Sequence, residues 1–244
     1  MQLDKAGCAV QVDPMRMAFI LPFVVSLSPA GASEMCTEDA MIVFDGSGSM
    51  AEMGFNTINE PRIFEARRAL HTALPTIGQS RRLGLIIYGP GGEGGCGNVD
   101  VRFGPQWEAA PKILDDVDAL EPDGDTPLTE AVAAAADALN YQTQPGAIVL
   151  VTDGKETCGG DPCALAAQLA AKGKDLTVHV IGYKVRGDQF AWEGEGHNDY
   201  NEAISVASCL ADRTGGQYVG AETVDQLVGA LRVTLGCSVI GRLD

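Results

Sequence analysis

Aromatic and basic residues are scarce in this 244-residue chain, and their scarcity argues against two classes of protein. Only 6% of the residues are aromatic, which leaves no obvious platform on which bases or sugars could stack. Lysine and arginine number 17 against 33 aspartate and glutamate residues, so the net charge is −16. A chain of that charge repels nucleic acid phosphates and anionic lipid headgroups. We therefore expect neither a nucleic-acid-binding protein nor one held on a membrane surface.

Long apolar runs are also missing. The run at residues 18–27 is about half as long as the roughly 20 residues that a membrane-spanning helix needs. It follows Met15-Arg16-Met17 and precedes the small residues Ala30-Gly31-Ala32, a pattern typical of a secretory signal peptide. We therefore predict that residues 1–32 are an N-terminal extension and signal peptide, with initiation at Met15 or Met17 as an option and an uncleaved anchor as the alternative. Because no cysteine directly follows the run, we expect a bacterial periplasmic or secreted protein that is not inserted in the membrane after signal removal.

The exported part, residues 33–244, is expected to contain disulfides because it has an even number of cysteines. The glycines and the Asp-Pro pair between Cys158 and Cys163 favour a local bridge between these two. The other four cysteines allow three pairings, of which Cys36 with Cys237 joins the ends of the domain and Cys96 with Cys209 follows by elimination. Metal binding by the cysteines is the alternative, but no second closely spaced pair and no nearby histidine completes a zinc site.

Residues 37–236 alternate between buried strands and amphipathic helices. Short apolar runs at 41–44, 83–88, 147–151 and 176–181 are typical of strands buried on both faces. Apolar residues at helical spacing predict helices over 128–139, 203–211 and 224–235. Val99, Val101 and Phe103 alternate with polar residues and predict an edge strand with one wetter face, reached through a hairpin-like connection. The sequence thus predicts one α/β domain with a doubly wound, mostly parallel sheet, one antiparallel edge strand and helices on both faces.

Oxygen-bearing side chains follow the predicted central strands. Asp45, Ser47 and Ser49 come directly after the strand at 41–44, Thr126 opens a helix, and Asp153 follows the strand at 147–151. In such sheets, binding sites gather beyond the carboxyl ends of the strands. Two carboxylates and three hydroxyls are the ligands that a hard divalent cation prefers. We therefore predict a metal site built from these five residues.

These motifs resemble the metal-ion-dependent adhesion site of the von Willebrand factor type A domain family. The resemblance covers residues 37–236 and is strongest to exported bacterial members with a single such domain, whose Thr-Asp-Gly-x-Glu-Thr-Cys-Gly-Gly-Asp-Pro-Cys stretch is matched by residues 152–163. It implies a Rossmann-type fold and a divalent cation, Mg²⁺ first with Mn²⁺ or Ca²⁺ possible, held by Asp45, Ser47, Ser49, Thr126 and Asp153. Some relatives carry a chloride-channel name, but we do not transfer that activity because the exported chain has no membrane span.

Each of these residues also has a structural explanation. Asp45 and Asp153 can end strands by accepting backbone N–H bonds, and Ser47 and Ser49 suit any tight turn. Thr126 before Pro127 is a good N-cap. The joint occurrence of three such loops in this order favours metal binding over a metal-free remnant.

The predicted function is protein binding, in which the acidic group of an unknown protein partner completes the coordination of the cation. Phe190, Trp192 and Tyr200 lie in a long polar segment and are candidate partner-binding residues, with a plain surface excursion as the alternative.

Two other functions compete with this one. A metal-independent scaffold subunit of an envelope complex is the first alternative, and a metal-dependent phosphoryl hydrolase is the weaker one. We expect no enzyme, because Ser47 stands where an aspartate phosphatase has its second carboxylate, and because His71, His179 and His197 adjoin no nucleophile motif. The glycine-rich run 89–97 also lacks the Gly-Lys-Ser/Thr ending of a phosphate-binding loop.

Overall fold

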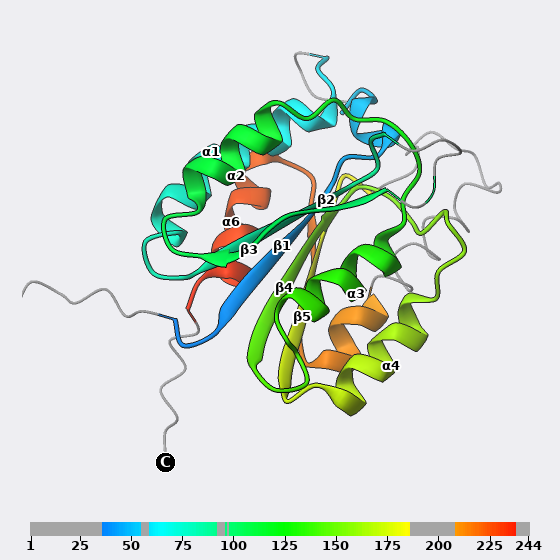
Figure 1. Ribbon diagram of the computed structural model, residues 1–244. Coiled ribbons are helices and arrows are strands. Elements are labelled where there is room, and N and C mark those ends of the chain that lie inside the picture. Colours follow the sequence, from blue (N-terminus) through cyan, green and yellow to red (C-terminus); the bar gives the residue numbers. More distant parts are fainter. Residues whose placement is uncertain (1–35, 55–58, 92–95, 97, 186–207, 238–244) are drawn as a thin grey trace, which may run out of the picture. The chain divides into compact units, whose positions relative to one another are not determined.

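The computed structural model describes residues 36–54, 59–91, 96, 98–185 and 208–237. They form a six-stranded sheet of order β3-β2-β1-β4-β5-β6 with helices on both faces (Figure 1). All neighbouring strands are parallel except β2 and β3, which are antiparallel. The predicted fold class, with one antiparallel strand at the edge, is confirmed. The strands are β1 Asp39–Asp45, β2 Leu83–Tyr88, β3 Val99–Gln106, β4 Pro145–Thr152, β5 Asp175–Tyr183 and β6 Tyr218–Ala221.

The sheet is buried on both faces because apolar side chains alternate between two cores. Along β1, Ala40, Ile42 and Phe44 pack in one core, and Met41 and Val43 pack in the other. Helices α1, α2 and α6 cover the first face, whereas α3, α4 and the helical residues 208–214 cover the second. The α-helices with defined bounds are α1 Arg62–Ile77, α2 Ala110–Asp118, α3 Leu128–Ala138, α4 Pro162–Lys172 and α6 Val224–Leu235, and a short 3₁₀ helix, η1, spans Gly48–Ala51.

Two details differ from the sequence prediction. Strand β6 was missed, because Tyr218–Ala221 is short and contains a glycine. In β3, Val101 is 47% exposed, whereas Val99 and Phe103 pack against opposite cores. Irregular pairing between β2 and β3 shifts the register there, so the expected apolar face of β3 does not form. The predicted helix at 203–211 begins outside the described residues.

Three disulfides join segments that are distant in sequence: Cys36–Cys237, Cys96–Cys158 and Cys163–Cys209. The predicted bridge between the ends of the domain is therefore confirmed, but the pairings Cys158–Cys163 and Cys96–Cys209 were wrong. Cys163 lies in the first turn of α4 and bonds to Cys209, on the helical segment that covers the same sheet face. Cys158 does not bond to it, because its sulfur is joined to Cys96; the Cys158 N–H donates to Glu156 Oε1 at 2.8 Å. Among the described residues, no helix has both the length and the apolar character needed to cross a bilayer.

Candidate metal centre

The five predicted ligands gather at the carboxyl edge of β1 and β4. Asp45 is the last residue of β1, and Asp153 directly follows β4, the neighbouring parallel strand. Thr152 connects the two strand ends, because its hydroxyl donates to Asp45 Oδ2 at 2.7 Å. Asp45 is fully buried and Asp153 is only 6% exposed. The expectation that these two carboxylates lie side by side follows directly from the parallel pairing.

Asp45 also shapes the loop that follows it. Its Oδ1 accepts a hydrogen bond from the Ser47 N–H at 2.9 Å, which turns the chain back over the strand end. The turn lies so close to the end of β2 that glycines are needed: a Cβ on Gly89, whose φ is 112°, would lie 2.5 Å from the Ser47 nitrogen. Asp45 therefore has the structural role considered from sequence, in addition to any role toward a cation.

The serine hydroxyls bridge from this loop to Asp153. Ser47 Oγ and Ser49 Oγ lie 3.0 Å apart, and Ser49 Oγ donates to Asp153 Oδ1 at 2.5 Å. Ser47 is 1% exposed, so its hydroxyl is held inside the edge rather than on its surface. These contacts bring the first and third predicted loops together at one point.

Thr126 approaches the same point from the second loop. Backbone hydrogen bonds from Gly48 N to Gly124 O and from Asp123 N to Gly46 O, each 3.0 Å, join the second loop to the first. The Thr126 N–H donates to Thr157 Oγ1 at 2.8 Å. A Cβ built on Gly154 would lie 3.8 Å from Ser49 Oγ and 4.0 Å from Thr126 Oγ1, so both hydroxyls face the Gly154 backbone.

The structure does not support the alternative in which Thr126 caps a helix. The N-cap position of α3 is Pro127, and no side chain caps from that position. Glu156 takes this role instead: its Oε2 accepts from the Thr129 N–H at 2.8 Å and from the Thr129 hydroxyl at 2.5 Å. Sequence reasoning missed Glu156. The Thr126 hydroxyl has no hydrogen bond to any described residue, so it remains available to a ligand.

A buried arginine completes the site, and no sequence motif marks it. Arg62 opens α1, and its Nη1 donates to Asp153 Oδ2 at 3.1 Å and to the Ser49 carbonyl oxygen at 3.0 Å. Burial, and after it the charge of the nearby Asp45 carboxylate, nevertheless raise the pKa of the Asp153 carboxyl to about 7. The hydrogen bond from Ser49 and the charge of Arg62 act in the opposite direction.

The donor set fits a small divalent cation. Mg²⁺ binds oxygens at about 2.0–2.1 Å in an octahedron, so neighbouring ligand oxygens lie about 3 Å apart. The 3.0 Å between the two serine hydroxyls meets this requirement. Two carboxylates and three hydroxyls would hold the ion. The raised pKa of Asp153 is expected for a buried carboxylate beside a second one, when nearby positive charge does not fully compensate the two.

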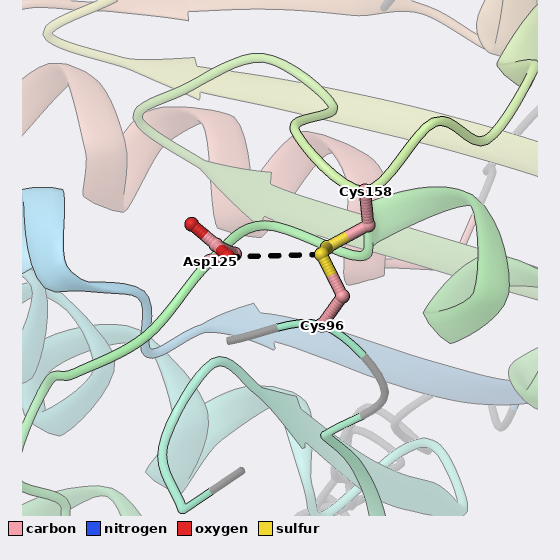
Figure 2. Close-up of side chains that lie close together, drawn as sticks. All are labelled: Cys96, Asp125 and Cys158. Atoms are coloured by element: carbon pink, nitrogen blue, oxygen red, sulfur yellow. Dashed lines mark hydrogen bonds between the residues drawn. A yellow bond between two sulfur atoms is a disulfide. The ribbon is translucent and has the colours of Figure 1, made fainter. Parts of the chain in front are cut away.

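Another cluster of potential ligands lies beside this site, and it has a different explanation. Cys96, Asp125 and Cys158 are the only group of three or more His, Cys, Asp or Glu side chains in the described residues whose ligand atoms lie within 4.8 Å of one another. Figure 2 shows that the two sulfurs form a disulfide and that the Asp125 side chain lies beside it. Asp125 Oδ2 is 3.7 Å from Cys96 Sγ. Since a disulfide offers no thiolate, this cluster is a covalent link next to Thr126 and not a cysteine metal site.

The remaining candidates lie elsewhere. His71 Nε2 is 2.8 Å from Asp118 Oδ2 on the surface. His179 lies within β5 and lines a cavity of about 290 Å³, together with Pro145 and Asp175 from the starts of β4 and β5, at the opposite end of the sheet. Phe190, Trp192, Tyr200 and His197 lie outside the described residues.

Comparison with known proteins identifies the domain. Residues 40–156 match the family model of the von Willebrand factor type A domain. The chain carries a von Willebrand factor type A domain. It is also 27% identical to the uncharacterized protein YwmD of Bacillus subtilis over 209 residues, which cover 82% of this chain and 86% of YwmD.

Solved structures of this type share the fold. The protein BatB from Bacteroides thetaiotaomicron superposes with a TM-score of 0.58 at 20% identity, covering 81% of this chain and 98% of BatB. Proximal thread matrix protein 1 from the mussel byssus superposes with a TM-score of 0.56 at 15% identity, covering 84% of this chain and 46% of the mussel protein. That structure is described as having a zinc-occupied metal-ion-dependent adhesion site. At these identities the likeness concerns the fold alone.

Proposed function

We propose that this von Willebrand factor type A domain is an exported protein-binding module, in which a divalent cation at the carboxyl edge of β1 and β4 is completed by an acidic group of a partner. The observation that carries the proposal is the convergence of three loops: Ser49 Oγ lies 3.0 Å from Ser47 Oγ and 2.5 Å from Asp153 Oδ1, and Thr126 Oγ1 faces the same backbone at Gly154. The zinc-occupied site of the mussel matrix protein, which has the same fold, supports it.

The cation would be held by Asp45, Ser47, Ser49, Thr126 and Asp153, with Mg²⁺ as the first candidate. Asp45 Oδ2 already accepts from Thr152, and Asp153 Oδ2 already accepts from Arg62, so few carboxylate oxygens remain as direct ligands of the ion. A bound ion would act as a Lewis acid with a coordination position open to a carboxylate. The residues would hold and orient it, and the partner would supply the last ligand.

Binding is favoured over catalysis by the surroundings of the candidate nucleophile. Asp45 is fully buried and its oxygens accept bonds from Ser47 and Thr152, so it is poorly placed to attack a phosphorus atom. His71 and His179 lie away from this edge. Turnover of a phosphate ester that is lost in Asp45→Asn would contradict this part of the proposal.

Thermal unfolding after chelation tests the proposal. Addition of Mg²⁺, Mn²⁺ or Ca²⁺ at about 100 times the dissociation constant should stabilise the native state by roughly 2.7 kcal/mol, or about 5–10 °C in Tm for a domain of this size. Thr126→Ala should lose the shift while keeping its Tm without metal, because the Thr126 hydroxyl has no bond to a described residue. The control is Thr143→Ala, whose hydroxyl bonds to the exposed turn at Asn140. An equal shift in wild type and Thr126→Ala, or none with any ion, would contradict the metal site.

A further inference from the structure

Arg62 is a buried cation within the proposed metal centre. Its side chain is 10% exposed, and that of Asp153, its partner at 3.1 Å, is completely buried. A third contact from Nη1 reaches Glu52 Oε2 at 3.2 Å, but the Glu52 side chain is 68% exposed. Solvent therefore screens the attraction between Glu52 and Arg62, and Asp153 is the main counter-charge of Arg62.

Part of the guanidinium group has no acceptor among the described residues. Its Nε is buried and has no hydrogen-bond partner in that part of the chain. The bonds that Arg62 donates to described residues all leave from Nη1, so Nη2 has no acceptor in that part of the chain. A buried donor without a partner costs free energy, so its retention calls for an explanation. The positive charge of the guanidinium provides one, because a charge acts on the site without a hydrogen bond.

The charge balance of the site shows what that charge does. Asp45 and Asp153 together neutralise one divalent cation, so without Arg62 the loaded site would be electrically neutral. With Arg62 the loaded site carries one net positive charge, on a chain whose total charge is −16. We infer that Arg62 sets the charge of the loaded metal centre, weakening its hold on the cation and giving it affinity for a partner carboxylate. This inference rests on the proposed function and adds the residue that determines its anion specificity.

Two opposite effects follow from this role. Removing the charge of Arg62 should tighten cation binding by about tenfold, because like charges repel strongly in a partly buried site. It should also weaken binding of a carboxylate to the bound ion by threefold or more. A residue that only positions Asp153 would show a different result, since its loss would weaken both.

The experiment uses the full chain at pH 8, where protons compete little for Asp153. Mn²⁺ affinity is measured from the electron paramagnetic resonance signal of free Mn²⁺, and acetate binding from the loss of water-proton relaxation at constant ionic strength. Arg62→Gln removes the charge, Arg62→Lys keeps it, and Arg68→Gln removes an exposed charge of the same helix, paired with Glu60, as the matched control. Glu52→Gln removes the opposite charge from an exposed position that tolerates change, so it tests the inference even where Arg62→Gln does not fold.

We expect Arg62→Gln to bind Mn²⁺ more tightly and acetate more weakly than wild type. Both affinities should stay within about twofold of wild type in Arg62→Lys and Arg68→Gln. Glu52→Gln should change both affinities in the opposite direction and by less. Unchanged or weaker Mn²⁺ binding in Arg62→Gln, or no effect of Glu52→Gln where Arg62→Gln is unfolded, would overturn the inference and leave the metal site intact. Absence of Mn²⁺ binding in wild type would instead overturn the proposed function, and this inference with it.

Discussion

Asp153 has two competing partners at its carboxylate, a proton and the proposed cation. Its pKa is about 7 in the metal-free protein, so between about pH 4 and 7 the folded chain keeps a proton on Asp153. The unfolded chain has already released that proton in this range. The contribution of Asp153 to the free energy of unfolding therefore falls as the pH rises through this range and is constant above it. A cation needs the ionised form, so it must displace the proton below pH 7.

We therefore predict that Mg²⁺ affinity rises about tenfold per pH unit below pH 7 and levels off above it, because one proton is released per ion bound. Calorimetric titrations between pH 5.5 and 8.5 in buffers of different ionisation enthalpy would measure both affinity and proton release. Asp153→Asn should bind more weakly and without this pH dependence. A flat profile in wild type would show that Asp153 does not contact the ion.

The tight turn after β1 leads to a second prediction at the level of single residues. Gly89→Ala should destabilise the fold by about 2 kcal/mol or more, because φ is 112° and the new Cβ would clash with the Ser47 backbone. Gly104→Ala in β3 is the control, since nothing lies within 4 Å of its Cβ position. Chemical denaturation would measure both. Equal, small effects would mean that the turn adapts easily.

Sequence reasoning found the candidate ligands but not the residues around them. Asp45, Ser47 and Ser49 are close in sequence, and parallel pairing places Asp153 beside them, so local motifs were sufficient. Arg62 meets Asp153 across 91 residues and Glu156 meets Thr129 across 27, and no local pattern marks such contacts. Their roles depend on the packing of α1 and α3.

Glu156 links the start of helix α3 to the loop next to the proposed metal centre. The Glu156 carboxylate caps the first turn of α3 and also binds the Cys158 N–H, while Thr126 lies two residues before the helix.

Most elements were predictable because buried strands and amphipathic helices have clear periodicities. Strand β6 and the exposed Val101 were not, because a short strand and an irregular register leave no periodic signal.

We predict that Glu156→Gln lowers the free energy of unfolding by about 1–2 kcal/mol, since it loses charge-assisted hydrogen bonds to the helix N-terminus. It should also weaken cation binding, because the loop at Thr126 loosens. Glu130→Gln, an exposed carboxylate in the same first turn, should change stability by less than about 0.5 kcal/mol. Similar losses in both variants would argue against the capping role.

At the scale of the whole molecule, the disulfides connect the ends of the described domain and its loops. Cys36–Cys237 spans 201 residues of sequence, and Cys163–Cys209 spans 46. In the chain-entropy view, a longer closed loop removes more conformational freedom from the unfolded chain. The local bridge expected from sequence would have given the smallest such gain.

Replacing Cys36 and Cys237 by alanine should therefore cost up to about 5 kcal/mol, and replacing Cys163 and Cys209 up to about 4 kcal/mol. Denaturant unfolding of each double variant would measure the loss. If the Cys36 and Cys237 variant is as stable as wild type, the end-to-end bridge does not reduce the conformational freedom of the unfolded chain enough to matter for stability. Peptide mapping without reduction checks the pairings themselves.

The most direct test of the metal centre is anomalous X-ray scattering from crystals of the chelated protein soaked in Mn²⁺. We predict one strong anomalous peak in the domain, surrounded by the oxygens of Asp45, Ser47, Ser49, Thr126 and Asp153, at distances of about 2.1–2.3 Å for direct ligands. A peak beside Cys96 and Asp125, or no peak at the end of β1 and β4 at saturating Mn²⁺, would contradict the proposed site and the function built on it.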